Sequence, residues 1–411
     1  MLAEHLEGPR APAPGWGRLR ADLGPGYLIN GLIGFIFAAT GPVAIILAVG
    51  TRGGLSPAEL ASWVFGVFFI NGLLSMLMSW RYRMPLGFAW TIPGTVLVGP
   101  ALQHLSFAEV IGAFYATGVV VLLMGMSGWV KRFMATLPMP IVMGMVAGVF
   151  LRFGLDLVRA LHSDIAIAGP MVAVFLLLSA VPALGRRLPP VIGALLAGAA
   201  AMTVLGSVDF GTIGSLGMAR PVMQIPAWSL AAMIELVVPL AITVLVVQNG
   251  QGVAVLKAAG HEPPVNTIAA VCGIGSLLSA AVGAVSSCLT GPTNALLTSS
   301  GERERHYIGA LGFGILAMSF GLMAPMFTDL MLAAPAEFIM VLGGLAMLRV
   351  LQGAFLASFG GMFSLGALIS FLVTVADIGL FNIGAAFWGL LAGLAVSWLL
   401  ERQDFARAAK G

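Results

Sequence analysis

The sequence predicts an all-α polytopic membrane protein with fourteen transmembrane segments in a seven-plus-seven inverted repeat. Of the 411 residues, 59% are hydrophobic and 9% are charged, against about 25% charged in a typical soluble domain. Such a chain needs lipid as its main solvent. Charge-free runs of bilayer length follow one another along the chain. Two Thr-x-Pro motifs interrupt the third and tenth runs, which we therefore expect to be broken.

A membrane crossing needs about 20 apolar residues, and the chain holds enough such runs for fourteen crossings. The first seven are Tyr27–Gly50, Leu60–Trp80, Met84–Ala108, Val110–Val130, Phe133–Leu151, Ile165–Gly185 and Leu188–Val208. The others are Leu236–Leu256, Pro263–Gly301 (long enough for two crossings if one is short or partly extended), Tyr307–Thr328, Leu330–Leu348, Val350–Ala376 and Ile378–Leu400. The predicted organisation is a cytoplasmic tail, a first repeat, an extracytoplasmic connection, a second repeat and a cytoplasmic tail, at residues 1–24, 25–208, 209–227, 228–400 and 401–411.

The basic residues place both termini in the cytoplasm. With that orientation, 16 Lys and Arg residues fall in cytoplasmic segments and four fall outside, which is a strong positive-inside bias. The cytoplasmic set is Arg10, Arg18, Arg20, Arg81, Arg83, Lys131, Arg132, Arg186, Arg187, Lys257, Arg303, Arg305, Arg349, Arg402, Arg407 and Lys410. The outer set is Arg52, Arg152, Arg159 and Arg220.

Seven spans in each half make the two repeats inverted in the membrane. Thr40-Gly-Pro-Val-Ala-Ile-Ile-Leu-Ala-Val-Gly50 aligns without gaps on Gly250-Gln-Gly-Val-Ala-Val-Leu-Lys-Ala-Ala-Gly260. Likewise Ala89-Trp-Thr-Ile-Pro-Gly-Thr95 aligns on Cys288-Leu-Thr-Gly-Pro-Thr-Asn294. The two matches fall in the same order, in the first and third spans of each half, and so indicate a common repeat.

Proline explains why the third and tenth spans should break. It removes a backbone donor and disfavours helical angles at the preceding residue. We expect Gly87–Ile92 and Ser286–Gly291 to be extended, with short helices beginning near Pro93 and Pro292, a favoured first helical position. Irregular backbone at membrane depth must be covered by protein or line a cavity, and helix starts favour anions. The alternative is that both prolines only kink ordinary spans.

Polar residues at these breaks, and at a polar interruption of the eighth span, are the candidate substrate contacts. Amides supply donors and acceptors without charge; their alternative role is to cap or bridge helices. The predicted site consists of Trp90, Thr91, Pro93, Gly94, Thr95, Gln248, Asn249, Gln251, Thr290, Gly291, Pro292, Thr293 and Asn294. Phe35, Phe37 and Phe88 are weaker candidates than Trp90 for contact with an aromatic ligand, because bulky aromatics more often face lipid or fill a core.

Three segments resemble the benzoate transporter family of bacterial inner membranes: FAWTIPGTVLV, VVQNGQGVAVLKAAGHEPPVN and CLTGPTNALLTSSGERERHYIGA. The resemblance covers roughly Leu23 to Leu400, and the chain is more distantly similar to nucleobase–cation symporters. It implies that the third and tenth spans each contain a short strand and a half helix, and that they frame the substrate together with the eighth. It also implies that a core of spans 1–4 and 8–11 moves against a gate of spans 5–7 and 12–14.

The chain departs from the nucleobase symporters where they carry acidic residues in the eighth and tenth spans. The matching positions are Gln248 and the region 291–293, all neutral. Acids there would repel a carboxylate, so their absence fits an anion, but it also removes the obvious proton carrier. The prediction is a multi-pass inner-membrane secondary transporter that imports benzoate or a similar small aromatic carboxylate by proton symport. An anion channel, or a transporter of another small organic anion or a nucleobase-like substrate, stays open, as does a homodimer.

The remaining polar residues suggest no enzyme, cofactor or metal site. No G-x-x-x-x-G-K-[ST] loop is present, which disfavours an ATP-driven pump. The five histidines lie in the tail or in predicted loops, and Cys272 and Cys288 lie in apolar sequence where no disulfide is expected. Arg152 and Asp156 are four apart and are expected to pair. Four acids near span ends should be solvated or cap helices: Glu235, Asp329, Glu337 and Asp377.

Overall fold

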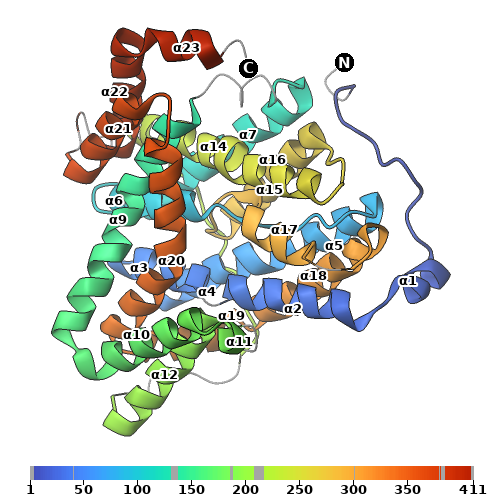
Figure 1. Ribbon diagram of the computed structural model, residues 1–411, viewed down its shortest axis with the longest axis horizontal. Helices are drawn as coiled ribbons and strands as arrows, with labels where there is room; N and C mark the ends of the chain where they lie inside the picture. Colours follow the sequence, from blue (N-terminus) through green and yellow to red (C-terminus); the bar gives the residue numbers. More distant parts are fainter. Residues whose placement is uncertain are drawn as a thin grey trace. The chain divides into compact units, whose positions relative to one another are not determined.

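The computed structural model describes residues 4–39, 41–130, 138–185, 188–207, 217–299, 301–378, 380 and 385–408. The described chain is mostly helical, with one sheet of two three-residue strands (Figure 1). The predicted helical class is therefore confirmed. Several residues used for the topology and repeat predictions lie outside the described residues: Thr40, Lys131, Arg132, Arg186, Arg187 and Lys410.

Six helical stretches of the described chain are long and apolar enough to cross a membrane. They are Pro25–Arg52, Pro57–Tyr82, Phe107–Ser127, Met139–Ser163, Leu230–Ala258 and Ala336–Phe359. A seventh is present if the pair Arg303–Leu322 and Ala324–Met331, bent by 67°, forms one span. Shorter apolar helices of 10–17 residues lie between them: Ile92–Ala101, Ile165–Ala180, Pro190–Leu205, Val265–Ala281, Ser364–Ala376 and Ala385–Leu400. The chain is thus a multi-pass membrane protein.

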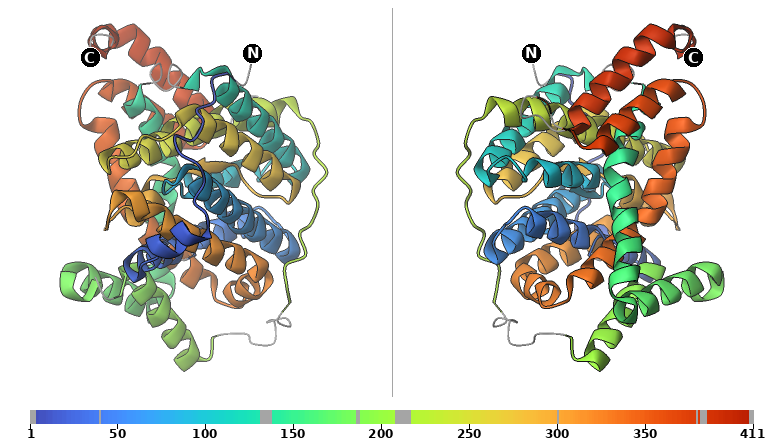
Figure 2. Two further views of the ribbon diagram at one scale, coloured as in Figure 1. Left: turned by 90° about the vertical axis from the view of Figure 1, so that its right-hand side faces the viewer. Right: turned by 90° about the vertical axis from the view of Figure 1, so that its left-hand side faces the viewer.

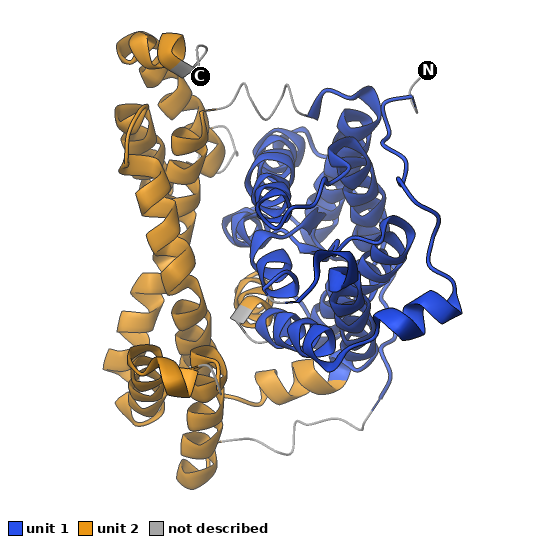
Figure 3. Ribbon diagram, turned by 45° about the vertical axis from the view of Figure 1, so that its right-hand side comes forward, with its two compact units in different colours: residues 1–39, 55–137, 216–325 blue, residues 40–54, 138–215, 326–411 orange. Residues whose placement is uncertain are grey.

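The chain divides into two compact units, each built from segments of both halves of the sequence (Figure 3). Unit 1 comprises Met1–Ala39, Leu55–Leu137 and Leu216–Pro325. Unit 2 comprises Thr40–Gly54, Pro138–Ser215 and Met326–Gly411. The boundaries predicted from the sequence, including the core and the gate, stay predictions.

Unit 1 contains both strands and the helices that are interrupted by π-helical segments. Its first elements are α1 (Trp16–Asp22), α2 (Pro25–Ala39), α4 (Pro57–Phe65), the π-helical η1 (Gly66–Ile70), α5 (Asn71–Tyr82), β1 (Phe88–Trp90), α6 (Ile92–Ala101) and α7 (Phe107–Ser127). Its later elements are α13 (Leu230–Ala232), η3 (Met233–Val237), α14 (Val238–Ile242), η4 (Thr243–Gln248), α15 (Asn249–Ala258), α16 (Val265–Ala281), β2 (Ser287–Leu289), α17 (Gly291–Leu297), η5 (Arg303–Arg305) and α18 (His306–Leu322). η3 and η4 are π-helical and η5 is a 3₁₀ turn.

Small residues let the helices of unit 1 approach closely, as is usual in membrane proteins. α7 and α16 lie side by side (Figure 2), and a Cβ atom on Gly125 would lie 2.3 Å from the backbone nitrogen of Ala270. α18 packs against α2 at Gly31, where an added Cβ would lie 2.3 Å from the carbonyl oxygen of Gly309. α18 also packs against α5 at Gly72. These contacts exclude any side chain and fix the helices that surround the two strands.

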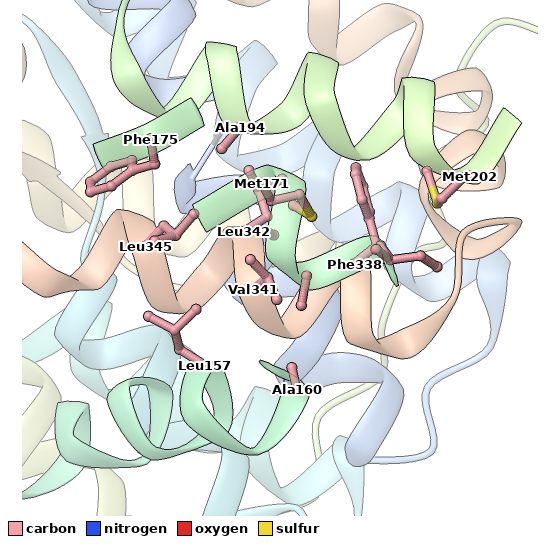
Figure 4. Packing of buried hydrophobic residues seen from close by; sticks show 13 residues of the cluster. Leu157, Ala160, Met171, Phe175, Ala194, Met202, Phe338, Val341, Leu342 and Leu345 are labelled. Atoms are coloured by element: carbon pink, nitrogen blue, oxygen red, sulfur yellow. The ribbon is translucent and has the colours of Figure 1, made fainter. Parts of the chain in front are cut away.

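The elements of unit 2 in its described part are all helices, apart from the isolated bridge residue Leu380. It contains α3 (Gly41–Arg52), α9 (Met139–Ser163), α10 (Ile165–Ala180), α11 (Pro182–Gly185), α12 (Pro190–Leu205), α20 (Ala336–Phe359), α21 (Ser364–Ala376), α22 (Ala385–Leu400) and α23 (Arg402–Ala408); α19 (Ala324–Leu332) spans the boundary between the units. Met171, Phe338, Leu342 and their neighbours from α9, α10, α12 and α20 form its apolar core (Figure 4).

Three expectations about charged residues are wrong. Arg152 and Arg349 were placed at span ends, but α9 and α20 continue through them. Arg152 does not pair with Asp156; it forms an ion pair with Asp377. Asp156 instead accepts from Arg52 at 2.7 Å and from Arg159 at 3.2 Å. An i,i+4 pair with the basic residue first is the weaker order on a helix; Asp156 pairs with Arg159, three residues later on α9, and with Arg52 of α3.

The third wrong expectation concerns Glu235, which is buried rather than solvated at a span edge. Its side chain is 5% exposed and contacts His104. The prediction for the cysteines is confirmed, because Cys272 and Cys288 are both buried and free.

Candidate functional site

The two broken spans meet in a short antiparallel strand pair, which we call the strand crossing. β1 pairs with β2 in the register Phe88↔Leu289, Ala89↔Cys288 and Trp90↔Ser287. Each strand leads directly into a short helix, β1 into α6 and β2 into α17, and all six strand residues are buried. The predicted breaks, and the helix starts near Pro93 and Pro292, are confirmed. Proline at each helix start ends the strand and begins the helix within two residues.

The two helix starts lie at opposite ends of the strand crossing. The register places Thr91 beside Ser286, and the N–H of Thr91 donates to the carbonyl oxygen of Ser286 at 3.0 Å. At the other end, the N–H of Thr290 donates to the carbonyl oxygen of Gly87 at 3.4 Å. Four residue steps, from Gly87 to Thr91, separate the two ends, or roughly 13 Å at about 3.3 Å per step. A single carboxylate group can therefore contact only one helix start at a time.

The two threonines at the helix starts are used differently. The Oγ1 atom of Thr91 accepts from the N–H of Gly94 at 3.1 Å and so caps α6. It also donates to Oγ1 of Thr243 at 3.0 Å. Thr290 makes no such cap on α17, and its buried hydroxyl has no hydrogen-bond partner among the described residues. The hydroxyl of Thr290 is therefore available to a ligand.

Asn294 holds the strand crossing together. Its Oδ1 atom accepts from the N–H of Gly87 at 2.9 Å, and its Nδ2 atom donates to the carbonyl oxygens of Gly87 at 2.9 Å and Thr290 at 2.7 Å. The amide is thus committed to the backbone of both broken spans. Thr95 is also committed, because its hydroxyl donates to the carbonyl oxygen of Thr91 at 2.9 Å. Both residues position the site.

The eighth predicted span contacts both broken spans. The Oδ1 atom of Asn249 accepts from the N–H of Leu289 at 2.7 Å, while its Nδ2 atom is buried with no partner among the described residues. Gln248 is also buried, whereas Gln251 is exposed. Gln251 packs against Gly291, where an added Cβ would lie 2.8 Å from the Cβ atom of Gln251.

Aromatic rings pack beside the strand crossing. The ring of Trp90 lies 5.0 Å from that of Phe68, and Phe68 lies 4.5 Å from Phe320. Phe35 completes the group at 5.7 Å from Phe320. We call these four residues the aromatic cluster. The Nε1 atom of Trp90 is buried with no acceptor among the described residues, so Trp90 combines an apolar face with an available donor.

The strand crossing is rich in donors and poor in charge. None of the hydrogen bonds described for it involves an Asp or Glu side chain. An indole N–H and an amide NH₂ can only donate, and an unsatisfied buried donor costs about 1–3 kcal/mol. An anion with acceptor oxygens would remove that penalty. Within the described part of the chain, no three His, Cys, Asp or Glu side chains are placed to hold a metal ion.

The sequence model of the BenE family, described as benzoate membrane transport protein, matches residues 21–399. The chain belongs to this family. The benzoate transporter resemblance of its motifs is thereby confirmed, and the chain is a membrane transport protein rather than an enzyme. The more distant similarity to nucleobase–cation symporters stays a prediction.

Two curated proteins are similar over nearly the whole chain. "Inner membrane protein YdcO" of Escherichia coli (strain K12) is 29% identical over 374 residues, which cover 90% of this chain and 94% of that protein. "Benzoate membrane transport protein" of Acinetobacter baylyi (strain ATCC 33305 / BD413 / ADP1) is 26% identical over 389 residues, covering 93% and 97%. These relatives support the assignment of the chain as a multi-pass inner-membrane protein of the BenE family.

Solved structures of anion transporters share the fold. The transmembrane domain of the cyanobacterial bicarbonate transporter BicA matches with a TM-score of 0.59 and 17% identity, covering 90% of this chain and 97% of that domain. SLC26A9 matches with a TM-score of 0.63 and 14% identity, covering 91% of this chain and 65% of that one. Murine Slc26a9 in the inward-facing state matches with a TM-score of 0.61 and 13% identity, covering 97% and 74%.

For this BenE family member, the structure brings most of the predicted site residues to the strand crossing. Trp90, Thr91, Asn249, Thr290 and Asn294 make or adjoin its contacts. Pro93, Gly94, Thr95, Gly291 and Thr293 lie buried at the helix starts, while Gln251 and Pro292 are exposed. Thr243, Phe68 and Phe320 also reach the site and were not predicted. The sequence feature that could have identified Thr243 is its place in the same apolar span as Gln248.

Proposed function

We propose that this protein is a secondary active transporter that imports benzoate, or a similar small aromatic carboxylate, across the inner membrane by proton symport. The observation that carries the proposal is a set of three buried polar atoms without partners in the described chain: Nε1 of Trp90, Nδ2 of Asn249 and Oγ1 of Thr290. Each can donate a hydrogen bond to a carboxylate. The aromatic cluster next to Trp90 supplies apolar contact for a ring.

Burial of these donors supports alternating access as the transport mechanism. Trp90 is 3% exposed, Asn249 2% and Thr290 5%, so a ligand reaches them only after protein elements move apart. In the proposed cycle, a core of spans 1–4 and 8–11 moves against a gate of spans 5–7 and 12–14, in a chain with fourteen spans, two inverted repeats and cytoplasmic termini. The substrate contacts then belong to spans 3, 8 and 10.

Uptake of radiolabelled benzoate into proteoliposomes tests the proposal. With an acidic exterior, a proton symporter accumulates benzoate above its external concentration; without a pH gradient, uptake stops at equilibrium. Uptake that reaches only equilibrium under both conditions would identify a channel. Failure to take up benzoate, together with uptake of another organic anion, would refute the proposed substrate.

A second candidate, transport of a different small anion, is favoured by one observation. Two of the solved structures that share the fold are a bicarbonate transporter and an anion transporter. An aliphatic carboxylate would use the same donors without the aromatic cluster. Competition by acetate as strong as by benzoate would favour this candidate.

Charge selectivity gives a sharper test of the site. Hydrogen bonds to a charged group contribute about 1.5–3 kcal/mol against about 0.5–1.5 for neutral ones, so benzoate should compete roughly ten-fold better than benzamide. Gln248→Glu should reverse this preference, because like charges repel strongly in a buried site. Gln251→Glu places the same charge on an exposed side chain, where water and salt screen it, and should change the preference less. Equal competition by both ligands in the wild type would contradict the proposed selectivity.

A further inference from the structure

The buried Glu235 and the partly exposed His104 form an acid–histidine pair at some distance along the chain from the strand crossing. The Nε2 atom of His104 lies 2.9 Å from Oε2 of Glu235. The side chain of Glu235 is 5% exposed and that of His104 is 31% exposed. Glu235 belongs to η3, within the apolar stretch Leu230–Ala258. Ionisable groups within such a stretch are expensive to bury and are usually functional.

Few other titratable groups face the pair. Of the described elements that pack against η3, α7 carries Glu109 and Tyr115, while α6, α13 and α14 carry none. The carboxylate of Glu109 accepts from the N–H and hydroxyl of Ser106 at 2.8 and 2.7 Å, which holds it at the start of α7. Arg220 lies in the segment that leads to α13 and is exposed. A proton that reaches this place therefore finds two main acceptors, Glu235 and His104.

The same two elements carry both this pair and part of the substrate site. His104 follows α6, and Thr91 begins α6; Glu235 and Thr243 lie on the stretch η3–α14–η4. α6 is hydrogen-bonded to that stretch at one end, where Thr91 donates to Thr243 at 3.0 Å. At the other end, His104 contacts Glu235 at 2.9 Å. The ten residues of α6 span about 15 Å, so the two contacts join the elements at both ends.

We propose that the Glu235–His104 pair binds the coupling proton. The inference rests on the proposed symport and names the residues that perform it. Protonation converts the carboxylate of Glu235 to a neutral acid and reverses the direction of its hydrogen bond with the imidazole of His104. Because both partners sit on elements joined at Thr91 and Thr243, a change at the pair alters how α6 lies at the strand crossing. With the proton at Glu235 and His104, the proton site is separate from the uncharged substrate site, where no acid would repel a carboxylate.

The proton balance is simple. His104, neutral with its proton on Nε2, gives that proton to Oε2 of Glu235 and takes one at Nδ1 from a hydronium ion, which leaves water. The pair gains one proton, and His104 is neutral before and after the step. Release of that proton on the opposite side restores the carboxylate. One proton moves with one benzoate anion, and no net charge crosses the membrane. On the predicted topology the pair lies toward the outer side, where an importer would load its proton.

Comparison of two transport modes in Glu235→Gln tests the inference. Proteoliposomes with the full chain are assayed for accumulation driven by a pH gradient and for exchange of labelled against unlabelled benzoate at equal pH. Exchange requires no net proton release, so accumulation should fall at least about ten-fold more than exchange does. His104→Gln, at a partly exposed position, should shift the same ratio. Glu262→Gln is the matched control, because Glu262 is an exposed carboxylate.

The possible outcomes separate this inference from the proposed function. Full accumulation in Glu235→Gln, or an equal loss of both modes, overturns the pair as the proton site. If the wild type carries no benzoate at all, the proposed function fails, and infrared difference spectra between acidic and alkaline pH decide the inference independently. A protonated carboxylic acid band that disappears in Glu235→Gln but persists in Glu262→Gln supports it. A band that persists in Glu235→Gln refutes it.

Discussion

At the residue scale, two buried tryptophans show how surroundings decide a role. The indole nitrogens of Trp90 and Trp63 both lack an acceptor among the described residues. Trp63 lies between Phe107 and Phe114, within apolar packing. Trp90 lies on β1, beside the hydroxyls and amides of the strand crossing. We therefore infer that Trp90, and not Trp63, offers its N–H to the carboxylate of the proposed substrate.

We expect Trp90→Phe to weaken benzoate binding by about ten-fold to a hundred-fold. Phenylalanine keeps an aromatic ring but loses the N–H, and a hydrogen bond to a charged group contributes about 1.5–3 kcal/mol. The dissociation constant of the purified protein, measured by titration calorimetry, checks this. Trp63→Phe loses an equally buried N–H and should leave the constant nearly unchanged. An equal loss in both variants would mean that indole burial, and not the site, determines affinity.

His261 gives a prediction about stability against pH. It is buried in the turn between α15 and α16, with its Nε2 atom 3.2 Å from Nδ1 of His306. Burial, and next the charges of His306 and Arg303, lower the pKa of His261 from 6.5 to about 4. The unfolded chain therefore binds a proton more readily than the folded one between these values, and stability is lost as the pH falls from about 6.5 to about 4. Above 6.5 this contribution is fully present.

The melting temperature should accordingly fall across that pH range in the wild type and fall less in His261→Gln. The substitution removes the proton acceptor while it keeps a polar side chain of similar length. His162→Gln removes an exposed histidine and serves as the control, with a pH dependence like that of the wild type. Identical pH profiles for the wild type and His261→Gln would show that the buried histidine pair does not limit acid stability.

Among single residues, those next to a proline were predictable and those that act through distant contacts were not. Thr91 and Thr290 adjoin the prolines that break their spans, and this local rule identifies them. Phe68 and Phe320 read as ordinary apolar residues of long spans, because their place beside Trp90 depends on contacts far apart in sequence. The same holds for His104 and Glu235, which are 131 residues apart.

At the element scale, the strand crossing is held by one side chain. Asn294 makes three hydrogen bonds that join the backbone before β1 to the start of α17. Its role differs from that of Thr290, whose hydroxyl makes none within the described residues. The sequence placed both residues in one ligand site, since both follow the same pattern. The two roles are distinguished only by the contacts with Gly87, 207 residues away in sequence. These contacts make Asn294 a positioning residue and leave the hydroxyl of Thr290 as the available donor.

We expect Asn294→Ala to lower stability and affinity together, and Thr290→Val to lower affinity alone. Loss of the amide removes the side-chain acceptor of the Gly87 N–H and one donor to each of two carbonyl oxygens, which keep backbone donors; a buried N–H left without an acceptor costs about 1–3 kcal/mol. Melting temperature and benzoate dissociation constant are measured for both variants. Thr298→Ala is a control in which a hydroxyl that donates to the carbonyl of Asn294 is lost, with a small effect expected. A stable Asn294→Ala variant with weak binding would instead make Asn294 a direct ligand contact.

Helices and strands could be predicted where a residue type restricts the backbone. They could not be predicted where packing determines the form of the helix. Proline placed both strand-to-helix transitions correctly. The π-helical segments η1, η3 and η4 have no such signature, although they carry Phe68, Glu235 and Thr243. Span ends were wrong at Arg152 and Arg349, because a charge interrupts an apolar run without interrupting a helix. Arginine is a good helix former whose long side chain can leave the apolar region.

At the scale of the whole molecule, helix length and charge distribution give different numbers of membrane crossings. Only six or seven described stretches are long enough to cross a membrane by themselves, whereas alternation of basic residues predicts fourteen crossings. The difference lies in the apolar helices of 10–17 residues and in the broken spans. Local thinning of the bilayer, or a partner strand or half helix, can complete a crossing that a single short helix does not span.

Cysteine labelling distinguishes these counts at three positions. Fourteen spans place residues 186 and 257 in the cytoplasm and residue 220 outside. In intact cells, a membrane-impermeant maleimide should label Arg220→Cys, while Arg186→Cys and Lys257→Cys should require permeabilised cells. Arg220 and Lys257 are exposed in the structure, so a failure to label reflects the side of the membrane rather than burial.

The native cysteines make the wild type its own control. Cys272 and Cys288 are both 0% exposed, so the folded wild-type chain should stay unlabelled from either side. The decisive comparison is between residues 186 and 220, because one predicted span, Leu188–Val208, separates them. If both label from the same face, that span does not cross, the first half has an even number of crossings, and the two halves cannot be inverted repeats. Opposite faces at 186 and 220, and again at 220 and 257, require an odd number of crossings on each side of the connection.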